Sequence, residues 1–347
     1  MRTTLIGNAG MRCLGAMAVL TLASIGFAQT RPPTVAPAAV EGGGAQRSVS
    51  EWLMRMHEAS RRRAYVGTFV VSAGGTMSSA RIWHVCDGEQ QMERVESLTG
   101  VHRSTFRRNQ QVVTFLPESR VVITEKRESL GLFPNLLKAQ DSSIAQFYGA
   151  RAGGHERVAG LEADVVQLQA LDSLRFGYRV WTEQKTGLVV KLQTLDNDGR
   201  VLEQAAFSEL QLDVPVSMAK LAQMMGNTEG YQIETPDLAK TSAAAEGWSL
   251  KNEVPGFKPM SCFKRLVGGT ADARHESTLQ WIFSDGLASV SLFVENFDSR
   301  RHGPPGATAL GATATLTRRM GDWWLTAVGE VPAQTLLAFA QGLERKK

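Results

Sequence analysis

The chain has 347 residues, of which 43% are hydrophobic and 21% are charged. These proportions are typical of folded proteins and exclude a largely disordered chain. The length is sufficient for two domains, each with its own core. The formal net charge of +4 is weakly basic and does not indicate a nucleic-acid-binding protein.

The first 28 residues predict a secretory signal peptide. Arg2 and Arg12 form a basic start, residues 14–27 carry no charge, and the small residues Gly26 and Ala28 lie at the positions that a signal peptidase reads. The apolar part is too short for a stable membrane anchor. Cys13 precedes the apolar run and is therefore not predicted to be lipidated. We expect cleavage after about Ala28, which removes two arginines and no acid and leaves an exported protein of formal charge +4 − 2 = +2.

A flexible leader and then a sheet-rich domain follow, over residues 29–47 and 48–213. The leader is rich in Pro, Ala and Gly. Ser48 and Glu51 have the spacing of a capping box, and the apolar spacing behind them predicts a helix at about 49–60. Strands are predicted at 65–72, 77–85, 91–98, 104–109, 111–116 and 121–125. Because no helix separates these strands, they should be antiparallel, and a sheet of so many strands must curl or close.

Residues 130–148 interrupt this pattern with a dense apolar segment and a short helix predicted at 142–148. Such a segment either plugs a cavity or covers a binding surface. Sheet structure resumes at 158–169. Residues 176–212 predict a three-stranded antiparallel meander, because apolar residues alternate and two turns interrupt them. The whole domain is expected to hold about nine or ten strands.

Residues 214–245 predict a linker, with a helix at 217–225 followed by Gly, Pro and an alanine run. This composition favours two lobes that move relative to each other. The second domain is predicted at 246–347. Its strands are expected at 262–267, 278–283, 287–295, 309–319 and 323–329. Pro332 marks the start of a final helix, so this domain should be a small sheet with a helix packed on it.

No motif in the sequence indicates catalysis, a metal or a cofactor. The six histidines lack metal-ligand spacing, and C-x-x-C, H-E-x-x-H, G-x-S-x-G and the phosphate-binding glycine motifs are absent. Asp196 and Asp198 have the types and spacing of acid–base or Ca²⁺-binding residues, but a hairpin turn explains them better. His84 beside Trp83 is the best isolated catalytic candidate. A strand places these two on opposite faces, and a structural histidine is the favoured interpretation.

Two cysteines, Cys86 and Cys262, remain after cleavage. They are either two separate buried thiols, which is the favoured interpretation, or a disulfide between the domains. Arginine runs recur at 61–63, 103 with 107–108, 300–301 and 318–319. These runs are either solvated surface or contacts for anionic groups such as acidic protein segments or lipid phosphates.

Several short stretches resemble one known family, the MucB/RseB negative regulators of the envelope-stress sigma factor. In the first domain the resemblance is carried by Arg157-Val158-Ala159-Gly160, Tyr178-Arg179-Val180-Trp181 and Leu195-Asp196-Asn197-Asp198-Gly199. In the second it is carried by Val254-Pro255-Gly256-Phe257, Phe283-Ser284-Asp285-Gly286-Leu287 and Val328-Gly329-Glu330-Val331-Pro332. These stretches occur in the family's order, and the resemblance extends over nearly all of the predicted mature chain.

The resemblance implies an α+β fold of mostly antiparallel β-structure. Its first domain would be an unclosed, curved half-barrel like the lipoprotein carriers LolA and LolB, with helices in its concave side. It further implies a periplasmic protein, without catalytic residues or cofactors, that binds the periplasmic part of a membrane-spanning anti-sigma factor of the RseA or MucA type. Binding would shield that factor from its first protease, and lipopolysaccharide or another lipid would release it.

On this basis we expect five lipid-facing residues: Trp83, Phe115, Leu132, Phe133 and Phe147. Arg300 and Arg301 are expected to face the protein partner. Two other functions stay open. A periplasmic lipid or lipoprotein carrier would need the cavity but no second domain, and an exported hydrolase would need a nucleophile or metal that the sequence does not show. A homo-oligomer is also compatible with the sequence.

Overall fold

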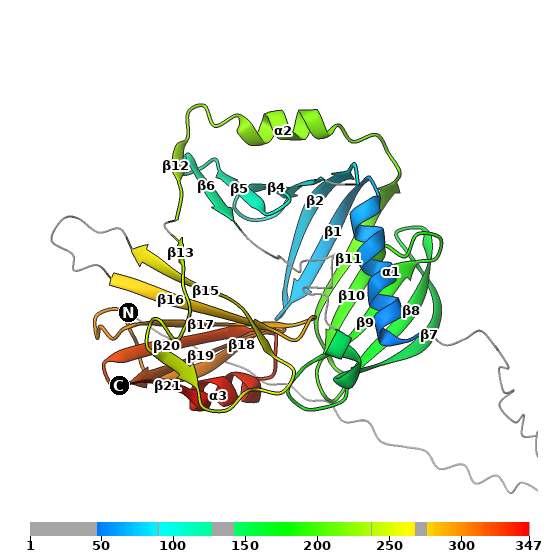
Figure 1. Ribbon diagram of the computed structural model, residues 1–347. Coiled ribbons are helices and arrows are strands. Elements are labelled where there is room, and N and C mark those ends of the chain that lie inside the picture. The colour runs from blue at the N-terminus through cyan, green and yellow to red at the C-terminus, as the bar shows by residue number, and fades with distance from the viewer. Residues whose placement is uncertain (1–46, 89, 127–141, 237, 268–275, 347) are drawn as a thin grey trace, which may run out of the picture. The chain divides into compact units, whose positions relative to one another are not determined.

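The computed structural model describes residues 47–88, 90–126, 142–236, 238–267 and 276–346 (Figure 1). These residues belong to one compact unit. The predicted signal peptide, nearly all of the leader, and Leu132 and Phe133 lie outside the described residues. None of the helices in the described ranges combines the length and the hydrophobicity of a membrane span.

We call the larger sheet and its helices the first domain. Its elements are α1 (Val49–Arg62), β1 (Tyr65–Ala73), β2 (Thr76–Cys86), β3 (Gln91–Ser97), β4 (Ser104–Arg108), β5 (Gln111–Leu116), β6 (Val121–Lys126), the 3-10 helix η1 (Ser142–Gln146), β7 (Tyr148–Val158), β8 (Leu161–Ala170), β9 (Gly177–Glu183), β10 (Val189–Leu195), β11 (Val201–Leu212), α2 (Met218–Gly226) and β12 (Gln232–Glu234). The strands form one twelve-stranded sheet in the order β12-β6-β5-β4-β3-β2-β1-β11-β10-β9-β8-β7. Its two end strands do not pair with each other, so the sheet is unclosed as expected.

The second domain is a smaller sheet with one helix. Its elements are β13 (Leu238–Lys240), β14 (Trp248–Leu250), β15 (Lys258–Val267), β16 (Glu276–Ser284), β17 (Ser289–Asn296), β18 (Gly306–Leu310), β19 (Thr313–Met320), β20 (Trp323–Gly329), α3 (Ala333–Gly342) and β21 (Leu343–Arg345). Seven strands pair in the order β13-β15-β16-β17-β20-β19-β18, and β14 pairs with β21. Phe339 of α3 contacts Phe257 and Phe283 in a buried core. The predicted small sheet with a packed helix is therefore confirmed.

Local sequence signals explain the start of α1. The Ser48 hydroxyl accepts a hydrogen bond from the Glu51 backbone N–H at 3.2 Å, and Glu51 in turn accepts one from the Ser48 N–H. This capping box satisfies two backbone donors that the first turn of a helix leaves without partners. The apolar face of α1, including Trp52 and Leu53, packs against β8, β9 and β10.

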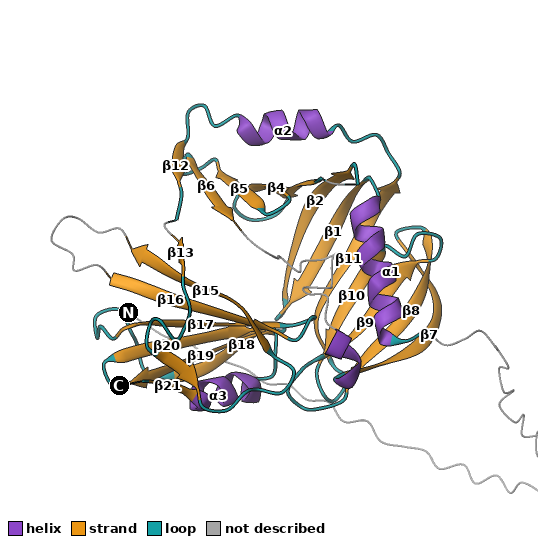
Figure 2. Cartoon of the chain, viewed as in Figure 1, coloured by secondary structure: helices purple, strands orange, loops and turns teal. Residues whose placement is uncertain are grey.

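Alternation along the strands separates the two faces of the larger sheet. On β4, Thr105 and Arg107 line a cavity on one face, whereas Phe106 between them is buried on the other. Phe106 belongs to the same apolar cluster as Leu221 and Met225 of α2. Helix α2 therefore covers the face opposite the cavity, while α1 lies on the cavity face. Figure 2 shows the two helices beside different strands of the larger sheet.

The structure adds strands that the sequence pattern did not indicate. β7 was not predicted, because residues 151–157 are exposed and include two glycines, so no apolar alternation is present. The predicted strand at 309–319 contains a turn at Gly311, whose φ of 58° is easily adopted by glycine. β18 and β19 form the two arms of this hairpin.

Residues 214–245, which the sequence predicted as a linker, form the connector between the domains, and strands of this connector pair with both sheets. β12 runs parallel to β6, and β13 runs antiparallel to β15. Each pairing spans three residues of the connector. An exposed sheet edge attracts further strands, so the connector occupies one edge of each sheet.

Cys86 and Cys262 are both free thiols in this structure. This agrees with the favoured interpretation of two separate thiols, but only Cys262 is buried, whereas Cys86 is half-buried. Burial raises the pKa of Cys262 to about 11, so this thiol stays protonated at neutral pH.

Candidate functional site: a cavity and a buried ion pair

A cavity of about 870 Å³ lies on the face of the larger sheet that also carries α1. Strands β1 to β6 and β9 to β11 all contribute to its wall. Its apolar lining includes Phe69, Val71, Ile82, Val95, Leu116 and Ile123. Cavities of roughly 300–1,000 Å³ with a mainly apolar lining are typical of small-molecule sites. The cavity is therefore a candidate binding site for an apolar or amphiphilic ligand.

The polar part of the cavity wall contains charges of both signs. Arg103 and Arg107 line it, together with Glu93, Glu125, Glu203 and Glu330. Arg103 is exposed and Arg107 half-buried, so both can meet an anionic group that enters from solvent.

Glu93 is held as a carboxylate inside the cavity wall. Its Oε1 lies 3.2 Å from Nδ1 of His84. Burial raises the pKa of Glu93, but the hydrogen bond and charge of His84 and the charge of Arg107 outweigh this effect, so the pKa is lowered overall. His84 is 1% exposed and stacks on Tyr65 with ring centroids 4.8 Å apart. These contacts support the structural interpretation of His84, the best catalytic candidate in the sequence.

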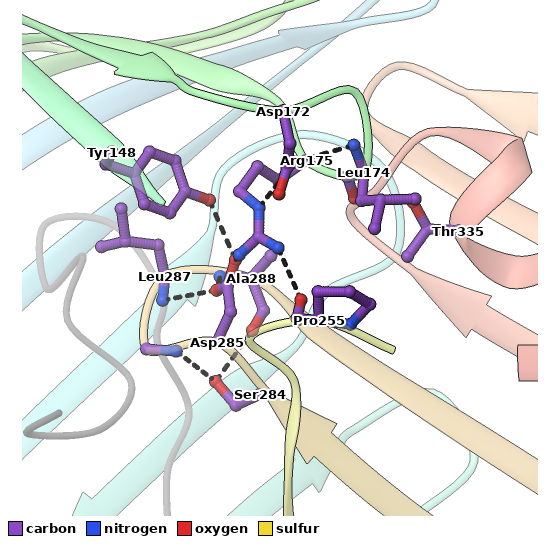
Figure 3. Close-up of polar contacts among 11 residues, drawn as sticks. Tyr148, Asp172, Leu174, Arg175, Pro255, Ser284, Asp285, Leu287, Ala288 and Thr335 are labelled. Atoms are coloured by element: carbon purple, nitrogen blue, oxygen red, sulfur yellow. Dashed lines mark hydrogen bonds and ion pairs between the residues drawn. The ribbon is translucent and has the colours of Figure 1, made fainter. Parts of the chain in front are cut away.

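The second candidate feature is a buried ion pair that joins the two domains (Figure 3). Arg175 lies in the loop between β8 and β9, and Asp285 lies in the turn between β16 and β17. Arg175 Nη1 donates to Asp285 Oδ2 at 2.9 Å. Its Nε donates to Asp172 at 2.9 Å, and its Nη2 donates to the carbonyl of Pro255 at 2.7 Å. All three nitrogens of the guanidinium thus have partners.

The carboxylate of Asp285 is equally well satisfied. Its Oδ1 accepts the backbone N–H groups of Leu287 at 2.9 Å and Ala288 at 2.7 Å. Its Oδ2 accepts the hydroxyl of Tyr148 at 3.1 Å as well as Arg175. Burial raises the pKa of Tyr148 well above its usual value, and the neighbouring Tyr178 and the negative charge of Asp285 add to this effect. Tyr148 therefore acts here as a neutral donor.

Aromatic rings surround this ion pair, and a further hydrogen bond joins the two domains beside it. The Arg175 guanidinium lies 4.4 Å from the ring centroid of Phe147 and 5.2 Å from that of Phe257. The hydroxyl of Thr335 donates to the carbonyl of Leu174 at 2.6 Å. We call this set of contacts, from Tyr148 and residues 172–175 to residues 255–257, 284–288 and 334–335, the junction.

The structure places the predicted site residues in different surroundings. Trp83 and Phe115 lie in the cluster under α2 rather than among the residues that line the cavity. Phe147 stacks on Arg175. Arg300 bonds Asp298 at 2.9 Å, and Arg301 lies 3.6 Å from Glu295. Lipid contact by the first three residues and partner contact by the two arginines stay predictions.

Sequence reasoning missed Arg175 as a functional residue and noted Asp285 only within a stretch that carries the family resemblance. The strands predicted at 278–283 and 287–295 leave residues 284–286 as their connection, and the structure contains a turn there. The two partners lie 110 residues apart, so no local pattern connects them. Within the described residues no group of His, Cys, Asp and Glu side chains has the geometry to hold a metal ion.

Two family models match the chain. The MucB/RseB N-terminal domain matches residues 48–225, and the MucB/RseB C-terminal domain matches residues 242–344. The chain belongs to the MucB/RseB family. This confirms the resemblance inferred from the short stretches quoted above.

Individual relatives agree with this family. The sigma factor AlgU regulatory protein MucB of Pseudomonas aeruginosa is 29% identical over 295 residues, which cover 82% of this chain and 87% of that protein. The sigma-E factor regulatory protein RseB of Escherichia coli is 24% identical over 295 residues, covering 84% and 89%.

Solved structures of MucB have the same architecture. A crystal structure of MucB in complex with MucA(peri) is similar, with a TM-score of 0.64 and 26% identity, over 86% of this chain and 99% of that one. A Pseudomonas aeruginosa MucA/MucB complex gives a TM-score of 0.67 at 25% identity, with the same coverage. The relatives are thus named as regulatory proteins, and MucB is known in complex with MucA.

Proposed function

We propose that this protein is a periplasmic negative regulator of a sigma factor of the sigma-E or AlgU type. It binds the periplasmic part of a membrane-spanning anti-sigma factor and shields it from its first regulatory protease. The observation that carries this proposal is the match of both MucB/RseB domain models, together with the likeness to MucB in complex with MucA(peri).

We further propose that lipopolysaccharide or a related amphiphile releases the protein from the anti-sigma factor. The cavity supports this part of the proposal. Acyl chains would lie against the apolar lining, and Arg103 and Arg107 would bind phosphate groups. Arginine suits this role because its planar guanidinium donates several hydrogen bonds to one phosphate. Binding of the amphiphile would then weaken binding of the anti-sigma segment. Reciprocity requires that the segment weaken amphiphile binding by the same factor.

A two-way titration tests this function. The affinity of a fluorescent peptide with the sequence of the anti-sigma factor's periplasmic segment is measured with and without saturating lipid A. We expect lipid A to weaken peptide binding by about 5- to 150-fold, the usual range of coupling between sites. An unchanged affinity at saturating lipid A would contradict release by lipid, and absent peptide binding would contradict the regulatory function itself.

The strand geometry of β4 provides a matched control for the phosphate contact. Arg107 lines the cavity, whereas the neighbouring Arg108 does not and instead bonds the side chain of Gln90 at 2.7 Å. Arg107→Gln should weaken lipid A binding, and Arg108→Gln should leave it unchanged. Equal effects of the two substitutions would point to general electrostatic attraction instead of a cavity contact.

A lipid or lipoprotein carrier is the second candidate, and the cavity is the observation that favours it. A carrier would bind amphiphiles without binding the anti-sigma peptide. The titration therefore separates the two functions. One structural detail favours the regulator, since Leu287, Ala312 and Glu330 of the second domain complete the cavity wall. In a carrier of the kind expected from the sequence, the second domain has no role.

A further inference from the structure

We propose that residues 284–288, the turn that holds Asp285, couple the contents of the cavity to the attachment of the second domain. This inference rests on the proposed function, because it assumes that an amphiphile enters the cavity. It adds the element that would transmit that event. The geometry places one residue of the cavity wall, Leu287, in the same turn as Asp285, which binds Arg175 of the first domain.

Leu287 is the first of these residues. It lines the cavity, is 1% exposed and belongs to the apolar cluster that contains Trp52 of α1 and Val180 of β9. A residue of the second domain is thus part of the core of the first domain. Its backbone N–H donates to Asp285 Oδ1, and Asp285 binds Arg175 through Oδ2. Leu287 is therefore only one hydrogen bond away from the buried ion pair.

The other two cavity residues of the second domain also lie beside contacts with the first. Ala312 follows Gly311, where an added Cβ would lie only 2.8 Å from Cβ of Ala73 in β1. Glu330 lies five residues before Thr335, whose hydroxyl binds the carbonyl of Leu174. All three cavity residues of the second domain are thus close in sequence to residues that touch the first domain.

A ligand whose acyl chain reaches the part of the cavity that Leu287 lines would press on this residue and so on the junction. Protein interiors are close-packed and transmit such displacements. Movement of the Leu287 backbone would pull its N–H, and that of Ala288, away from the Asp285 carboxylate. A buried ion pair tolerates little distortion, because each charge left without its partner in the interior is strongly unfavourable. The junction should therefore behave as a two-state element, closed or open, and the ligand should favour the open state.

Amide hydrogen exchange of the mature chain tests this inference. The probe is a lysophosphatidylethanolamine with one palmitoyl chain, used below its critical micelle concentration. At saturation we expect the N–H groups of Leu287 and Ala288 to exchange at least about tenfold faster, in line with a coupling free energy at the lower end of the usual range. The control is a similar turn in the first domain, where Asp196 accepts the N–H groups of Asp198 at 3.0 Å and Arg200 at 2.8 Å. Exchange there should not change.

A pair of substitutions tests the same link from the other side. Asp285→Asn keeps the shape of the side chain but removes its charge, so the junction should open without ligand. We expect the lysophospholipid to bind this variant about 5- to 10-fold more tightly, because less binding energy is spent on opening. Asp196→Asn is the matched control and should bind it as the wild type does. If Asp285→Asn does not fold, the exchange experiment on the wild type decides alone.

The outcomes separate this inference from the proposed function. The lysophospholipid could bind and weaken binding of the anti-sigma peptide while amide exchange at Leu287 and Ala288 stays unchanged. In that case the proposed function stands, and the proposed coupling through residues 284–288 is wrong. If no amphiphile binds, the lipid-release function fails and this inference fails with it. Faster exchange at residues 284–288 and at 196–200 alike would indicate general loosening and would also contradict it.

Discussion

Arg175 and Asp285 lie 2.9 Å apart with both side chains 0% exposed, although 110 residues separate them in the sequence. Each belongs to a different MucB/RseB domain. A buried ion pair is weak evidence for high stability, because desolvation opposes the attraction between the charges. It is, however, strongly sensitive to the loss of one partner. This relationship therefore suits a contact that is either fully made or fully broken.

Arg175→Met should destabilise the protein strongly. The substitution leaves Asp285 buried without its cation, and breaking such pairs typically costs about 3–5 kcal/mol. Urea unfolding followed by tryptophan fluorescence measures the change. Arg200→Met is the control, because Arg200 forms an ion pair with Asp196 at 2.8 Å while its side chain is 75% exposed, and it should cause no measurable change. Similar effects of both substitutions would show that the junction adds nothing to an ordinary surface pair.

Leu287→Ala should also destabilise the fold, through loss of packing in the first domain's core. Leu-to-Ala substitutions at fully buried sites typically cost about 2–5 kcal/mol. The Leu98→Ala control removes a side chain that is 52% exposed, and its effect should stay within about 0.5 kcal/mol. A Leu287→Ala variant as stable as the control would mean that the 284–288 turn does not insert into the first domain in solution.

The surface cluster around Asp298 should lose its contribution to stability in acid. Hydrogen bonds from Arg300, together with the charges of Arg300 and Arg301, lower the pKa of Asp298 from 3.8 to about 2. A carboxylate with a lowered pKa binds fewer protons in the folded state, so its stabilisation is present above about pH 4 and is lost as the pH falls towards about 2. Melting temperatures of wild type and Asp298→Asn should therefore differ at pH 6 and converge near pH 2. A difference that stays constant over this range would contradict the assignment.

The two thiols should differ in reactivity. Cys262 is buried with a pKa of about 11, so it should react very slowly with iodoacetamide at pH 8. Cys86 is only half-buried and should react first, although burial raises its pKa as well. Mass spectrometry of the native protein and of the protein unfolded without reductant measures this. Two labels on each mature chain, which lacks Cys13, are expected after unfolding, whereas none would indicate a disulfide between Cys86 and Cys262.

Local signals in the sequence predicted much of the fold. Ser48 and Glu51 marked the start of α1, and Gly199 ended a turn that the structure contains, with a φ of 81°. Alternating apolar residues located most long strands because one side of each strand faces a core. β7 was not predicted, because its residues 151–157 are exposed at the edge of the sheet. Burial imposes no alternation of apolar and polar residues there.

The sequence by itself determined the antiparallel strands, the small second sheet with its helix and, through short stretches in the right order, the family. These features depend on neighbouring residues, whose spacing can be read along the chain. Only the tertiary structure decided that Arg107 faces the cavity while Trp83 lies under α2, and that Arg175 meets Asp285. The face that a strand turns towards a ligand, and the partner of a buried charge, depend on how distant segments pack, and no local spacing encodes that packing.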